Sequence, residues 1–137
     1  MTRTVADVSA AADEFLTERH LGTLTTLRAD GTPHAVAVGF TWDAEAGVAR
    51  VITSDGNQKV RNVERGGYAA VTNIDGPRWI TLEGPATIRR ETEEVRSAER
   101  RYAQRYREPR PNPRRVVIEI TIARVMGASR LFAADRT

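Results

Sequence analysis

Short turns separate the extended segments in the first half of the chain, and they constrain the fold more than any other feature. Residues 29–32 (ADGT) lie between apolar-rich runs at 21–27 and 33–42, and further turns are expected at 43–47 and 75–77. An Asp-Gly pair between such runs is a strong hairpin signal. Parallel strands need connections of a dozen or more residues, so turns this short predict antiparallel neighbours.

The remaining patterns complete an order of strands and helices. Alternating or continuous apolar runs predict further strands at 48–53, 68–74, 79–83 and 115–122. A period of 3.6 residues predicts helices at 8–19, 58–65 and 91–106. The order favours an α+β, mainly β fold, in which a six-stranded antiparallel barrel carries two or three flanking helices.

The size and composition of the chain limit its class. With 137 residues, one domain over 1–137 is expected. No apolar run approaches the ~18 residues of a membrane span, and the N-terminus lacks the apolar core of a signal peptide, so a cytoplasmic protein without a membrane partner is expected. There are no cysteines, and His20 and His34 match no metal-ligand spacing, so no metal site is expected. Without a nucleophile or nucleotide-loop motif, an enzyme of this sequence would depend on a cofactor.

The segment 35–40 (AVAVGF) is apolar on both faces of its expected strand. The side chains of one face can fill the barrel, while those of the other face would be exposed to solvent unless another surface packs on them. A second copy of the chain is the simplest cover, so a homodimer is expected.

Lysine occurs once in the chain, at Lys59, although Lys and Arg together number 21. It lies in the first turn of an expected helix, shortly after a strand that ends at Thr53 and Ser54. Free backbone N–H groups at a helix start attract anions, and the hydroxyls add donors. Val60 and Val63 mark the side of this helix that is expected to be buried, and Lys59 lies at its border. The alternative is therefore a lysine whose alkyl chain only covers apolar surface.

Arginine dominates residues 100–115 (RRYAQRYREPRPNPRR). The segment could be the solvated face of a helix, a nucleic-acid surface with stacking tyrosines, or a funnel for an acidic small molecule. Tyr102 and Tyr106 are four residues apart, which suits inward packing better than base stacking. On the pattern alone the arginines are expected in water. The tyrosine spacing favours anionic small-molecule ligands over DNA for this segment, so no nucleic-acid partner is expected.

Arg78 and Trp79 follow the third turn. They could form the wall of a site for a flat ligand, although plain packing of the tryptophan is the alternative.

Four segments, taken in their order, resemble the split β-barrel flavin and deazaflavin oxidoreductases. They are LGTLTTLRADGTPHAVAVGF, VITSDGNQKVRNV, RWITLEGPA and RYAQRYREPRPNPRRVVIE. This superfamily includes pyridoxamine 5′-phosphate oxidases and coenzyme F420-dependent reductases, and the last segment is similar to that of the F420-dependent biliverdin reductases. The resemblance implies a six-stranded antiparallel split β-barrel and a homodimer with cofactors in clefts between the subunits.

The resemblance also implies a set of cofactor-binding residues. The ring edge would lie along the backbone of Val36, Ala37 and Val38, and the ring beside Arg78 and Trp79. The phosphate would be held by Thr53, Ser54, Gln58, Lys59 and Asn62. The cofactor tail or the substrate would meet Arg110, Asn112 and Arg114. No catalytic acid or base is assigned.

The implied cofactor is coenzyme F420, with FMN as the alternative. Gln58-Lys59 has one cation fewer than the Arg-Lys pair often found in FMN-binding relatives. F420 carries a phosphodiester and a poly-glutamate tail, which suits the arginines around residues 105–115. The implied function is an F420H2-dependent reductase that transfers hydride to a conjugated acceptor, biliverdin or a similar tetrapyrrole. An FMN-dependent enzyme and a non-catalytic cofactor or tetrapyrrole carrier are the other candidates.

Overall fold

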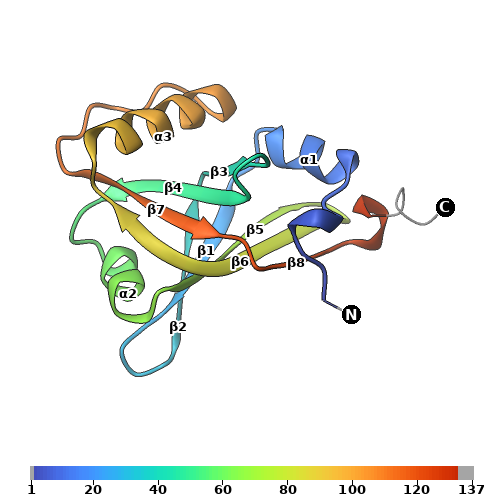
Figure 1. Ribbon diagram of the computed structural model, residues 1–137, viewed down its shortest axis with the longest axis horizontal. Coiled ribbons are helices and arrows are strands. Elements are labelled where there is room, and N and C mark those ends of the chain that lie inside the picture. The colour runs from blue at the N-terminus through green and yellow to red at the C-terminus, as the bar shows by residue number, and fades with distance from the viewer. Residues whose placement is uncertain (1, 133–137) are drawn as a thin grey trace.

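A curved antiparallel sheet forms the centre of the molecule in the computed structural model, which describes residues 2–132 (Figure 1). Its strands are β1 (Gly22–Leu27), β2 (Pro33–Val38), β3 (Phe40–Asp43), β4 (Val48–Ser54), β5 (Tyr68–Asp75), β6 (Arg78–Arg89), β7 (Arg115–Thr121) and β8 (Arg124–Gly127). They pair in the order β2-β1-β5-β6-β7-β4-β3, and β8 also pairs with β6. Among these residues the path ends at β2 and β3, so the sheet is not closed.

The α+β, mainly β, antiparallel architecture is confirmed, but the number of strands is larger than predicted. Residues 2–132 contain eight strands instead of the six predicted. One addition is β8, and the other arises because Gly39 divides the run predicted at 33–42 into β2 and β3. A Cβ at Gly39 would lie 3.1 Å from ring carbons of Tyr106 and 3.3 Å from Tyr102. The strand is therefore interrupted where two tyrosines pack against its backbone.

Strand β6 joins the two halves of the sheet. Its first half pairs with β5 and β8, and its second half pairs with β7. Gly84 lies between these halves, and a Cβ there would collide with the carbonyl oxygen of Thr121. The absence of a side chain lets β7 pass close to β6 where the partner strand changes.

Helices cover parts of the sheet (Figure 1). The α-helices are α1 (Ala10–Thr17), α2 (Gln58–Gly66) and α3 (Thr92–Arg105), and short 3-10 helices are η1 (Val5–Asp7) and η2 (Ser129–Leu131). Ser9 caps α1 by accepting the N–H of Ala12. Gly67 ends α2 in the left-handed conformation. Within residues 2–132, none of the helices combines the length and hydropathy needed to cross a membrane.

The inner face of the sheet forms the main core with α1 and α2. Its largest fully buried side chains include Phe15, Leu24, Phe40, Val71, Ile80, Leu82, Ile118 and Ile120. Val60 and Val63 of α2 are buried as predicted. On the other side of the sheet, Val95 and Ala98 of α3 pack against Val117.

The outer face of β2, β1, β5, β6 and β8 is exposed in the single chain. The strand register places one row of uncharged side chains across it: Ala37, Thr23, Thr72, Thr81 and Met126. Large apolar side chains flank this row, since Leu21 is 70% exposed and Ile74 is 63% exposed. Trp79 lies on the same face as Thr81. This surface is called the uncovered sheet face below.

Candidate functional site

A cleft of about 380 Å³ lies where β2, β4, α2 and the segment after α3 meet. Its walls come from the ends of β2 and β4, the first turn of α2, Tyr102 of α3 and the arginine- and proline-rich linker. Of the residues predicted to bind a cofactor or substrate, it brings together Ala37, Val38, Thr53, Ser54, Lys59, Arg110 and Asn112.

Two hydroxyls at the end of β4 are held as donors toward the cleft. The side-chain amide of Asn112 donates to Ser54 Oγ over 2.8 Å, and that of Asn57 donates to Thr53 Oγ1 over 3.0 Å. Each hydroxyl oxygen thus accepts a hydrogen bond from an amide, and its own hydrogen remains available to a ligand. Both residues line the cleft, so an anion placed there would meet two O–H donors.

The first turn of α2 adds positive charge beside these hydroxyls. Asn57, the N-cap residue, makes no side-chain capping bond to the helix, so the first N–H groups have no intrahelical partner and no cap. The ammonium of Lys59 is half-buried, and no ion pair to it is found within residues 2–132. Burial lowers the pKa of Lys59, because a cation loses solvation there without gaining a counter-charge. An anion bound in the cleft would supply this counter-charge.

Arginines of the linker border the same cleft. Within the described part of the chain, the side chains of Arg107 and Arg110 are exposed and make no ion pair or hydrogen bond. Arg115 differs, because its guanidinium bonds Glu99 at 2.7 Å and the carbonyl oxygen of Arg110 at 2.7 Å. Arg115 therefore fixes the linker, while Arg107 and Arg110 leave a positive rim for a ligand.

Four residues predicted to bind a cofactor or substrate lie near the cleft without lining it: Val36, Gln58, Asn62 and Arg114. Asn62 is buried and bonds Thr26 and Gln58, so it holds α2 against β1. Val36 packs against the main core. Arg114 donates to the carbonyl oxygen of Asp55 and borders a separate cavity of about 470 Å³.

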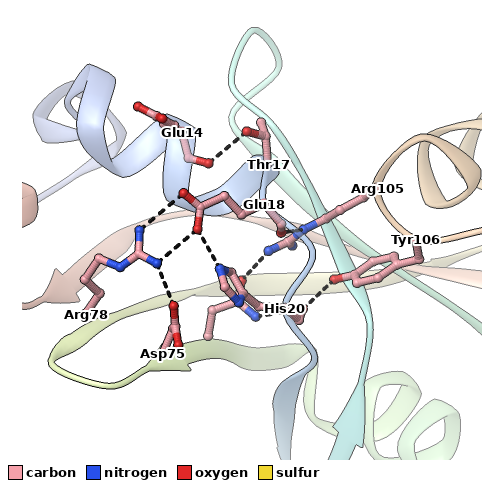
Figure 2. Close-up of polar contacts among 9 residues, drawn as sticks. Glu14, Thr17, Glu18, His20, Asp75, Arg78, Arg105 and Tyr106 are labelled. Carbon is pink, nitrogen blue, oxygen red and sulfur yellow. Dashed lines mark hydrogen bonds and ion pairs between the residues drawn. The ribbon is translucent and has the colours of Figure 1, made fainter.

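Arg78 and Trp79 lie away from the cleft of their own chain, at the turn between β5 and β6. Figure 2 shows Arg78 between two carboxylates, with Glu18 at 3.1 Å and Asp75 at 2.6 Å. Hydrogen bonds from His20 and then from Arg78 lower the pKa of Glu18. Ligand atoms of Glu18, His20 and Asp75 lie within 4.8 Å of one another, but the guanidinium of Arg78 already occupies both carboxylates.

The prediction that the arginines of α3 lie in water is wrong for Arg105. Its guanidinium is buried and donates to the carbonyl oxygens of Glu18 and Phe40 and to Asn73 Oδ1, at 2.7–2.8 Å. Figure 2 shows Arg105 beside Glu18. Arg105 therefore anchors the end of α3 and does not meet a ligand. Its spacing from Ala98 and Tyr102, seven and three residues, would have placed it on the buried helix side.

Comparison with known proteins shows the family of the chain. The family model described as pyridoxamine 5′-phosphate oxidase matches residues 8–127. The chain therefore belongs to the pyridoxamine 5′-phosphate oxidase family. It is 56% identical over 132 residues to an F420H(2)-dependent biliverdin reductase of Mycobacterium tuberculosis (strain CDC 1551 / Oshkosh), covering 96% of each protein.

Solved structures show the same fold. A protein titled F420 reductase is 26% identical with a TM-score of 0.69, and the match covers 83% of this chain and 94% of that one. A conserved hypothetical protein from Mycobacterium tuberculosis is 25% identical with a TM-score of 0.77, covering 93% and 89%. The predicted resemblance to the split β-barrel oxidoreductases is confirmed.

Proposed function

We propose that this protein is an F420H2-dependent reductase that passes hydride to biliverdin or a similar conjugated tetrapyrrole. The observation that carries the proposal is the 56% identity, over 96% of both chains, to a protein with that activity in its name. The cleft supports it, because a half-buried lysine without a counter-ion and two free hydroxyl donors fit a cofactor phosphate.

Different residues of the cleft would bind different parts of the cofactor. Thr53, Ser54 and Lys59 would hold the phosphate, and the backbone of residues 36–38 would meet the ring edge. Gln58 and Asn62 support this clamp from behind, since their side chains bond each other and Asn62 bonds Thr26. Arg110 and Asn112 of the linker would hold the cofactor tail, with Arg114 beyond the cleft as a further contact. When bound, reduced F420 supplies the hydride, and the protein positions it.

The uncovered sheet face supports a homodimer. Ala37 belongs both to this face and to the lining of the cleft, so a second subunit that packs on the face borders the cleft as well. Arg78 and Trp79 would then reach the ring from the partner subunit, which explains why they lie away from the cleft of their own chain. A cytoplasmic location is part of the same proposal.

Thr23→Arg is expected to convert the dimer to a monomer and to weaken cofactor binding, because Thr23 is exposed on the uncovered sheet face, next to Ala37 of the cleft. A buried charge without a partner is strongly unfavourable. Sedimentation at micromolar concentration measures the change. Thr121→Arg, at an exposed position of β7 outside this face, is the matched control. A wild-type monomer that binds cofactor normally would disprove the dimer.

Two measurements test the function. Fluorescence titration of the purified protein with F420 and with FMN identifies the cofactor. Oxidation of F420H2 is then measured with biliverdin as the acceptor. The absorbance of the cofactor and that of biliverdin are both followed. Turnover with biliverdin supports the proposal. Tight FMN binding without F420 binding would favour the flavin enzyme, and binding of F420 and biliverdin without turnover would favour a carrier.

A further inference from the structure

A second cavity of about 330 Å³ adjoins the cleft, and the proposed cofactor contacts leave it unused. It is lined by Arg19, Leu21, Tyr102, Tyr106 and Arg107. Tyr102 and Arg107 also line the main cleft, so the two spaces share a wall. A molecule in the second cavity would therefore lie beside a cofactor in the first.

Two tyrosines form an aromatic wall of this cavity. The rings of Tyr102 and Tyr106 are 4.9 Å apart between centroids, and both pack against the bare backbone of Gly39. The single hydroxyl hydrogen of Tyr106 lies within reach of two carbonyl oxygens, of His20 at 3.0 Å and of Phe40 at 2.8 Å from the hydroxyl oxygen. This hydrogen bonding fixes the Tyr106 ring, and Tyr106 in turn supports Tyr102. A rigid aromatic surface of this kind suits a flat conjugated ligand.

Two arginines lie at this wall. Arg19 and Arg107 are exposed, and within residues 2–132 their side chains make no ion pair or hydrogen bond. Leu21, 70% exposed, adds an apolar side. Other arginines near α3 are already engaged, Arg101 with Asp43 and Arg115 with Glu99. A free guanidinium presents a planar fork of donors that matches a carboxylate.

We infer that this second cavity is the acceptor site, in which Arg19 and Arg107 bind the carboxylates of a flat conjugated substrate that stacks on Tyr102. The inference rests on the proposed function and specifies its substrate class as a conjugated tetrapyrrole acid. Biliverdin has this chemistry, since two propionate groups project from its conjugated chain. The arginines act as positioning groups, and the hydride transfer itself does not involve them.

The test compares biliverdin with its dimethyl ester, which keeps the conjugated chain and removes both negative charges. Arg19→Gln and Arg107→Gln are each expected to raise the KM for biliverdin about two- to fivefold, because exposed ion pairs are partly screened by solvent. The kcat should change little. The KM for the ester should be nearly the same in the wild type, the variants and the control Arg130→Gln, an exposed arginine of η2.

Direct binding separates failure of the site from failure of the function. The affinity for biliverdin is measured by its visible absorbance, without cofactor, in all variants. Arginine-dependent binding without turnover would disprove the reductase and keep the site. Turnover with the same KM in all variants would overturn the site and keep the function. An increase in KM that is as large for the dimethyl ester as for biliverdin would do the same. If the arginine variants become monomers in sedimentation, the cavity belongs to the subunit contact and the inference fails. No binding at all overturns both.

Discussion

Lys59→Ala is expected to weaken cofactor binding about ten- to a hundredfold while the fold without cofactor remains almost as stable. The ammonium is half-buried beside the hydroxyls of Thr53 and Ser54, and no counter-ion meets it within residues 2–132. A charge-assisted bond to a phosphate contributes about 1.5–3 kcal/mol. Without the phosphate, removing an unpaired and partly desolvated cation costs little. Fluorescence titration and urea unfolding measure the two quantities.

The same residue gives the binding a pH dependence. Burial lowers the pKa of Lys59 in the free protein, and a bound phosphate favours the charged form and raises it. Affinity should therefore be highest below the lowered pKa and fall as the pH rises through it. This alkaline loss should be absent in Lys59→Ala.

Arg61→Ala is the matched control on α2. Arg61 is exposed, and its side chain makes no hydrogen bond or ion pair within the described residues. Arg65, also exposed, is a poorer control because it donates to the carbonyl oxygen of Leu27 and to Asn62 Oδ1. Equal loss of affinity from Lys59→Ala and Arg61→Ala would indicate a diffuse positive field. Unchanged affinity in Lys59→Ala would show that Lys59 does not bind the cofactor phosphate and only covers apolar surface.

The local structure could be predicted, because turns and hydrophobic periodicity depend on residues that lie close together in the sequence. The Asp30-Gly31 pair predicted the β1–β2 hairpin, and the turns and apolar runs predicted that the neighbouring strands are antiparallel. The division of the 33–42 run at Gly39 could not be predicted in this way. It depends on Tyr102 and Tyr106, more than sixty residues later in the chain, packing against that glycine.

The candidate site shows the same division between local and distant determinants. The strand end at Thr53 and Ser54 and the helix start at Lys59 are neighbours in sequence, so their shared cleft was predictable. The partners that orient the hydroxyls are less accessible to prediction, because Asn112 reaches Ser54 across 58 positions of the chain. For Arg105, composition suggested solvent, whereas tertiary packing supplied three neutral acceptors that make burial possible.

Arg105→Met is expected to lower the free energy of unfolding by about 2–4 kcal/mol. Methionine fills a similar apolar volume, but two acceptors, the carbonyl oxygen of Glu18 and Asn73 Oδ1, lose the hydrogen bonds that Arg105 donates. Each unsatisfied buried acceptor costs about 1–3 kcal/mol. The carbonyl oxygen of Phe40 keeps the bond from the Tyr106 hydroxyl, which limits the loss. Removal of a buried charge offsets part of the cost.

Arg100→Met provides the comparison on the same helix. Arg100 is exposed and makes no side-chain hydrogen bond or ion pair among residues 2–132, so its replacement should change the stability by no more than about 0.5 kcal/mol. Urea unfolding at one fixed protein concentration measures both variants, since a dimer gains stability with concentration. Arg105→Lys should lose most of the same free energy, because a single ammonium cannot reach three acceptors in the fork geometry of a guanidinium. Equal stability of the Arg100→Met and Arg105→Met variants would show that Arg105 does not anchor α3.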